Sequence, residues 1–186
     1  MSKQRPVVAV LVGSLRKGSY NKQLAHALEK TAGDRAEFRH IRIDDLPLYN
    51  QDFDGDYPAV CKRLKDEIKA CDAVLFVTPE YNRSIPGVLK NAIDIASRPY
   101  GYSAFSGKPG AVIGTSAGAM ATALAQQHLR NVCVFLDIPL LQQPEAFVNY
   151  KQGMFAEDGS VTDESVAKFL GNFVDKYLQW IERFIA

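Results

Sequence analysis

Residues 7–21, VVAVLVGSLRKGSYN, constrain the fold of this chain more than any other stretch. The first six residues form an unbroken apolar run rich in valine, which is typical of a strand covered on both faces in a parallel sheet. A polar loop rich in Gly and Ser follows, and a helix is expected to begin near Ser19. Backbone N–H groups at a helix start favour an anion, most often a phosphate. The stretch therefore predicts a strand, a possible phosphate-binding loop and a helix.

This loop differs from the two common nucleotide-binding loops. Gly13 and Gly18 have the Walker A spacing, but Ser19 and Tyr20 stand where that motif needs Lys and then Ser or Thr. The dinucleotide motif G-x-G-x-x-G also fails, because residue 15 is Leu. The loop still supplies hydroxyl, guanidinium and amide groups that can surround a phosphate monoester without a metal. These groups belong to Ser14, Arg16, Ser19 and Asn21. The alternative is a polar loop that only caps the helix through Ser19.

Composition excludes several classes of protein. The chain has 186 residues, of which 47% are hydrophobic and 23% charged, and these values predict one globular domain over residues 1–186. A net charge of +1 favours neither a nucleic acid nor an acidic membrane surface as partner. No signal peptide or membrane-spanning run is apparent, so a cytoplasmic location is expected. Three cysteines without a C-x-x-C motif predict buried free thiols, with no disulfide framework and no Cys-rich metal or iron–sulfur site.

Five apolar runs alternate with helical patterns along the chain. The strands are expected at 7–12, 36–43, 73–78, 110–115 and 132–138. Right-handed connections between such elements produce an open parallel sheet with helices on both faces. Ligands of these sheets bind beyond the carboxyl ends of the strands. The loops at 13–21, 79–86 and 115–118 follow three of the strands, so we expect them to meet in one crevice.

The second loop has a different chemistry from the first. It combines an aromatic ring, Tyr81, with an amide, Asn82, between Pro79 and Pro86. This set suits a flat heteroaromatic ring, and a phosphate near one strand end with a planar ring near another describes flavin mononucleotide (FMN). A helix beginning near Pro86 would favour negative charge on the reduced ring. The alternative is an ordinary strand-to-helix turn with Tyr81 in the core.

Four segments resemble the NADPH-dependent FMN reductase family, which includes bacterial quinone and chromate reductases and azoreductase-like enzymes. They are GSLRKGSYN, LPLYNQD at 46–52, TPEYNRSIPGVLKNAID at 78–94 and GTSAG at 114–118. The motifs keep the family's order and cover nearly the whole chain, and P-E-Y-N-x-S-x-P-G is the most specific. The resemblance implies an α/β, flavodoxin-like three-layer sandwich with a five-stranded parallel sheet of order 2-1-3-4-5.

The resemblance also implies which residues bind the cofactor. Those expected around the FMN phosphate are Gly13, Ser14, Arg16, Ser19, Tyr20 and Asn21. Those expected to border the isoalloxazine are Pro79, Glu80, Tyr81 and Asn82, while Thr115, Ser116 and Gly118 would close the third side. Arg83 occupies a more variable position and would tune the choice of electron donor or acceptor. A 2′-phosphate of NADPH needs a nearby cation, for which Arg83, Arg98 and Lys108 are candidates.

The implied activity is a ping-pong oxidoreductase reaction. NADPH or NADH would pass a hydride to FMN, and a quinone or another acceptor such as chromate, an azo compound, a ferric chelate or free flavin would then take the electrons. No catalytic side chain is expected, because the flavin carries the chemistry. The family is commonly dimeric or tetrameric, and segments 100–105 and 128–145 are the expected subunit contacts.

Three other functions compete with this interpretation. One is a structural or regulatory module that has lost its flavin, against which the intact polar set of the first loop argues. A flavodoxin-like FMN electron carrier would not turn over NAD(P)H, but such carriers are usually strongly acidic, unlike this chain. The segment 114–118 also matches the nucleophile elbow G-x-S-x-G of hydrolases. A hydrolase needs an acid and then a His after the nucleophile, but the only later histidine is His128, and no Asp or Glu lies between Ser116 and it. His26 and His40 are expected to be surface residues.

Overall fold

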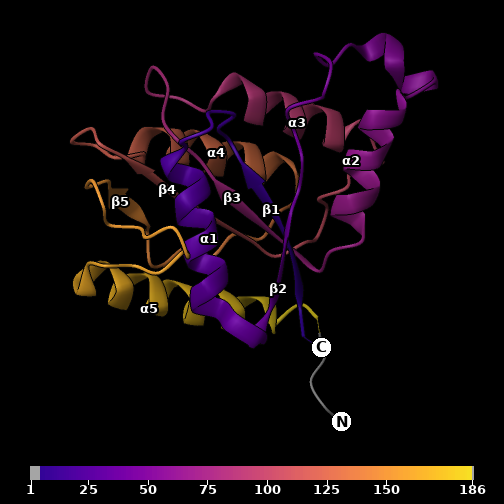
Figure 1. Cartoon of the computed structure of the whole chain (residues 1–186). Helices are drawn as coiled ribbons and strands as arrows, with labels where there is room; N and C mark the ends of the chain where they lie inside the picture. The colour runs from indigo at the N-terminus through magenta and orange to yellow at the C-terminus, as the bar shows by residue number, and fades with distance from the viewer. Residues whose placement is uncertain (1–4, 186) are drawn as a thin grey trace.

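The strands of the computed structural model form one parallel sheet in the order β2-β1-β3-β4-β5, and the model describes residues 5–185 (Figure 1). The strands are β1 (Val7–Val12), β2 (Glu37–His40), β3 (Ala73–Val77), β4 (Gly110–Ser116) and β5 (Phe147–Asn149). All four neighbouring pairs are parallel. The order 2-1-3-4-5 is that of flavodoxin-like folds, so the expected fold class is confirmed.

Helices cover both faces of this sheet (Figure 1). On one face lie α1 (Tyr20–Ala32) and α5 (Glu164–Ile181). On the other lie α2 (Ala59–Lys69), α3 (Gly87–Ser97) and α4 (Ala123–Phe135). Two short 3₁₀ helices, η1 (Gly33–Arg35) and η2 (Gln51–Gly55), complete the elements.

Strand β1 shows why its sequence must be apolar throughout. Val8 and Val10 pack into the core with α1 and α5, whereas Ala9 and Leu11 pack into the core with α2 and α3. All four side chains are fully buried. Because successive side chains point to opposite faces, a strand covered on both sides loses the usual alternation of apolar and polar residues.

The prediction of a strand at 132–138 is wrong. Residues 123–135 form α4, and the fifth strand lies at 147–149, where the sequence analysis expects no strand. The edge strand expected at 36–43 is present but shorter, at 37–40.

The burial pattern of α4 explains the error at 132–138. Leu129, Cys133 and Leu136 are buried, whereas Val134 and Phe135 are 81% and 69% exposed. Buried residues that recur every three or four positions are typical of a helix with one buried face. The β-branched composition of the segment favoured a strand, but the spacing of its buried residues favours a helix, and the helix forms.

The three cysteines are buried and unpaired, as expected. Burial raises the pKa of the Cys61 and Cys71 thiols and raises that of Cys133 to about 12, so all three stay protonated near neutral pH. Among residues 5–185, no helix combines the length and apolar character that crossing a bilayer requires.

Candidate active site

The loops that follow β1, β3 and β4 touch one another at the carboxyl edge of the sheet. The main-chain N–H of Gly13 donates to the carbonyl of Val77, with an N···O distance of 2.9 Å. A Cβ on Gly13 would lie 3.4 Å from Cδ of Pro79, and one on Gly114 would collide with the carbonyl oxygen of Thr78. The backbones can approach this closely because these two positions lack side chains. The expected convergence of the three loops is confirmed.

Asn21 joins the first helix to the third loop. Its Nδ2 donates to the carbonyl oxygen of Thr115 at 2.9 Å, and its Oδ1 accepts from the N–H of Thr115 at 3.0 Å. Both residues are buried. The side-chain amide expected to contact a phosphate is therefore used to hold the backbone of β4.

Several main-chain N–H groups of the first loop have no hydrogen-bond acceptor in the described part of the protein. Within residues 5–185, none of the N–H groups of residues 14–19 donates to a protein oxygen. The Ser19 hydroxyl accepts from the N–H of Lys22 at 3.3 Å, so Ser19 is the N-cap of α1. Ser14, in the same loop, is buried, and its hydroxyl makes no hydrogen bond within residues 5–185. Free N–H groups, a hydroxyl and a helix N-terminus together favour an anion.

Arg16 lies over an aromatic stack that borders this loop. Its guanidinium carbon is 5.0 Å from the centroid of the Tyr20 ring. On the stack, the Tyr20 and Tyr150 rings have centroids 3.5 Å apart and an interplanar angle of 14°. The N–H of Tyr150 donates to the carbonyl of Ser116 at 2.9 Å, which links the stack to the third loop. Sequence reasoning missed Tyr150, which follows the unpredicted strand β5.

The second loop is a tight hairpin turn. Tyr81 and Ser84 exchange two main-chain hydrogen bonds of 3.1 and 3.0 Å, and the φ angles of Asn82 and Arg83 are 51° and 60°. Positive φ at both central residues is the property of a type I′ turn. Tyr81 is 52% exposed, so the alternative that placed it in the core is wrong. The turn presents Tyr81, Asn82 and Arg83 to solvent.

Two side chains anchor this turn to α4. The carboxylate of Glu80 accepts from the N–H groups of Leu124 and Ala125, both at 3.0 Å. A negative group at a helix N-terminus is stabilising. Ser84 Oγ and His128 Nδ1 form a hydrogen bond of 2.9 Å. The Glu80 side chain thus points to α4.

The third loop contains an unsatisfied buried group. Ser116 Oγ accepts from the N–H of Gly118 at 3.2 Å, which shapes the turn after β4. Thr115 Oγ1 is buried and has no hydrogen-bond partner among residues 5–185. A buried hydroxyl without a partner is costly unless a ligand or water supplies one. Thr115 is also the residue whose backbone Asn21 holds.

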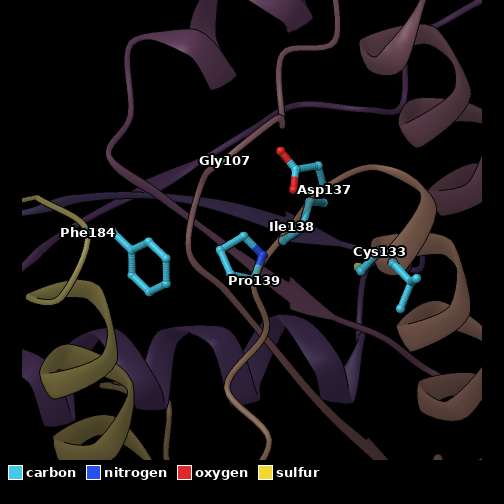
Figure 2. Close-up of a pocket in the computed structure, with 7 residues that line it drawn as sticks. Gly107, Cys133, Asp137, Ile138, Pro139 and Phe184 are labelled. Atoms are coloured by element: carbon cyan, nitrogen blue, oxygen red, sulfur yellow. The ribbon is translucent and has the colours of Figure 1, made fainter.

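A separate cavity of about 380 Å³ lies away from these loops (Figure 2). It is lined by Cys133, Asp137 and Phe184, among others, and by none of the predicted site residues. The N–H of Gly110, the first residue of β4, donates to the carbonyl of Pro139 at its rim, so the cavity is at the amino edge of the sheet. Since the Cys133 thiol stays protonated, the cavity offers no reactive thiolate.

Comparisons with known proteins agree with this geometry. The family model of NADPH-dependent FMN reductases matches residues 6–153. A 2-hydroxy-1,4-benzoquinone reductase from a Burkholderia species is 52% identical over 174 residues, covering 94% of this chain and 95% of that protein. An NAD(P)H-dependent FMN reductase from Pseudomonas aeruginosa is 42% identical over 175 residues, 92% of either chain. The solved structure of FerB, a flavoenzyme NAD(P)H:(acceptor) oxidoreductase from Paracoccus denitrificans, is 51% identical, with a TM-score of 0.93 over 96% of this chain and 98% of its own.

Replacement of Asn21 tests its role as a brace between loops. Asn21→Ala leaves the buried N–H and carbonyl of Thr115 without partners, so we expect the free energy of unfolding to fall by about 2–4 kcal/mol. Urea unfolding measures this loss. The exposed Asn131 of α4 supplies the control, because Asn131→Ala should change stability by less than about 0.5 kcal/mol. Equal effects of the two substitutions would contradict the assigned role.

Proposed function

This chain belongs to the NADPH-dependent FMN reductase family, and on that premise we propose that it oxidises NAD(P)H and reduces a quinone. The observation that carries the proposal is the junction of three loops at the carboxyl edge of the sheet, with unpaired N–H donors at the start of α1. Relatives named as quinone reductases support the acceptor. Chromate, azo compounds, ferric chelates and free flavin are further candidate acceptors, since an open flavin face admits varied molecules.

The residues present fit FMN. The N–H groups of residues 14–19, the Ser14 hydroxyl and the Arg16 guanidinium supply the donors that a dianionic phosphate needs. Thr115 Oγ1, buried without a partner in the described chain, is a further donor close to α1. The turn at 81–84 supplies an exposed ring and an amide beside them.

In this proposal the protein holds the binding loops in place, and the cofactor carries out the redox chemistry. When bound, FMN would supply the two-electron redox chemistry that links a nicotinamide donor to the acceptor. Asn21 holds the third loop against α1, and Glu80 and Ser84 hold the 81–84 turn against α4. Helix α3 begins at Gly87 just after this turn, and its N-terminus favours negative charge nearby. No side chain is required as acid, base or nucleophile.

The electron-carrier alternative has less support. The relatives of this chain carry names of enzymes that act on NAD(P)H or quinones. With a net charge of +1, the chain also lacks the strong negative charge with which small electron carriers dock on basic partners.

We further propose that Arg83 binds the 2′-phosphate of NADPH. The type I′ turn exposes this guanidinium at the site. Lys108, another candidate, donates to the main-chain oxygens of Lys69 and Cys71, before the start of β3, and is therefore at the wrong edge of the sheet.

We also propose that the chain forms a homodimer or homotetramer in the cytoplasm. Exposed aromatic and aliphatic side chains gather in the two segments expected at the contact: Tyr100 and Tyr102 in one, and Val134 and Phe135 in the other. Three unpaired cysteines suit a reducing compartment. Recovery of the native protein mainly in a membrane fraction would contradict the location.

Substitution of Arg16 tests the phosphate site. Arg16→Ala should weaken FMN binding by about tenfold to a hundredfold, because a charge-assisted hydrogen bond is lost, and should leave the affinity for riboflavin unchanged. Quenching of flavin fluorescence by the flavin-free protein measures both affinities. Lys17→Ala, at an exposed position in the same loop, is the control and should affect both flavins little. Equal weakening for FMN and riboflavin would show that Arg16 does not read the phosphate.

Substitution of Arg83 tests donor selection. Arg83→Ala should raise KM for NADPH about tenfold while KM for NADH stays nearly constant, because only NADPH carries the 2′-phosphate. Steady-state kinetics with one quinone give both constants, and Arg83→Lys should be intermediate. Unchanged constants for both donors would remove Arg83 from the site.

Sedimentation velocity tests the assembly. At micromolar concentration we expect a dimer or tetramer, and Phe135→Ser should shift the population toward monomer because it removes an exposed apolar contact. A wild-type protein that sediments only as a monomer would contradict the proposal.

A further inference from the structure

Two histidines and a glutamate meet on the surface, where α1 contacts the end of strand β2. His26 and Glu29 belong to α1, and His40 is the last residue of the edge strand β2. Glu29 Oε2 lies 3.0 Å from His40 Nε2 and 3.5 Å from His26 Nδ1. The two imidazole rings have centroids 4.8 Å apart. Both histidines are exposed or partly exposed, as the sequence predicts, but their meeting could not be read from positions 14 residues apart in different elements.

The three ligand atoms have the spacing of a metal site. All lie within 4.8 Å of one another. Two ligands bound to Zn²⁺ at about 2.1 Å with a tetrahedral angle are separated by about 3.4 Å. The distances from Glu29 Oε2 to His40 Nε2, 3.0 Å, and to His26 Nδ1, 3.5 Å, lie on either side of that separation. A small rotation of the exposed His26 side chain would bring the two ring nitrogens to it as well.

The backbone on both sides of this cluster is held firmly. Helix α1 is anchored through the buried Leu24, Ala25 and Leu28. His40 is paired in register with Val10 of β1. Helix α1 and strand β2 therefore hold the three side chains of the cluster at fixed positions, as a preformed metal site requires.

Among residues 5–185, no lysine or arginine pairs with the carboxylate of Glu29. The nearby Lys30 pairs with Asp158 at 2.6 Å, and Arg39 pairs with Glu37 at 2.8 Å. In the described part of the chain, residues 5–185, the ion pairs of Glu29 are with the two imidazoles only. The three side chains are 60%, 45% and 33% exposed for His26, Glu29 and His40, so an ion from solution can reach them.

We propose that His26, Glu29 and His40 bind one divalent transition-metal ion, with Zn²⁺ the best match. Two imidazoles and one carboxylate form a borderline ligand set that suits zinc, and water completes the tetrahedron. The bound ion ties α1 to the edge strand β2, whose outer side has no neighbouring strand. This stabilises the free edge of the sheet and is independent of the flavin chemistry at the carboxyl edge.

Zinc titration of the FMN-loaded protein tests the site. After treatment with a chelator, isothermal titration calorimetry at neutral pH should give one zinc ion per chain. The double variant His26→Gln with His40→Gln should bind zinc at least about tenfold more weakly. His128→Gln removes the remaining histidine of the chain, which lies outside the cluster, and should bind zinc like the wild type.

Thermal unfolding supplies a second readout. Zinc should raise the Tm of the wild type and of His128→Gln but not that of the double variant. Glu29→Gln, a milder single change, should also weaken zinc binding and covers the case in which the double variant folds poorly. Equal zinc affinity in the wild type and these cluster variants, or no binding at millimolar zinc, would overturn the proposal and leave a hydrogen-bonded surface cluster.

Discussion

The two hydrogen bonds between Asn21 and Thr115 hold the site together. They join the first turn of α1 to the end of β4, two segments that are 94 residues apart in the chain. Each bond satisfies a buried backbone group that would otherwise remain unpaired. The loop after β1 and the loop after β4 therefore keep a fixed relation, and Gly13 and Gly114 allow the loop after β3 to approach both.

Much of the fold follows from short patterns in the sequence. The runs at 7–12 and 73–77 are apolar without alternation because both faces of a parallel sheet are covered, and they predict central strands correctly. A similar apolar composition led to the wrong prediction of a strand at 132–138, where the buried residues recur at helical spacing. Strand β5 has only three residues, and its pairing with β4 comes from tertiary structure rather than from a local signal.

The meeting of the three loops at one edge of the sheet was predictable, but the direction of their side chains was not. Parallel topology alone brings three loops to one edge. Local sequence does not reveal that the Asn21 amide turns to β4, that the Glu80 carboxylate turns to α4, or that Tyr150 stacks on Tyr20. These contacts join elements distant in the chain, as does the cluster of His26, Glu29 and His40. Such pairings depend on how helices pack on the sheet.

The most direct test of the central claim is the absorption spectrum of the purified protein during anaerobic addition of NADPH. We predict a flavin band that bleaches rapidly and returns when a quinone is added, because donor and acceptor would use the same bound FMN. A flavin band that persists with both NADPH and NADH would contradict reductase activity and favour an electron carrier. A protein that neither contains nor takes up FMN would contradict the assignment of the three loops as its binding site.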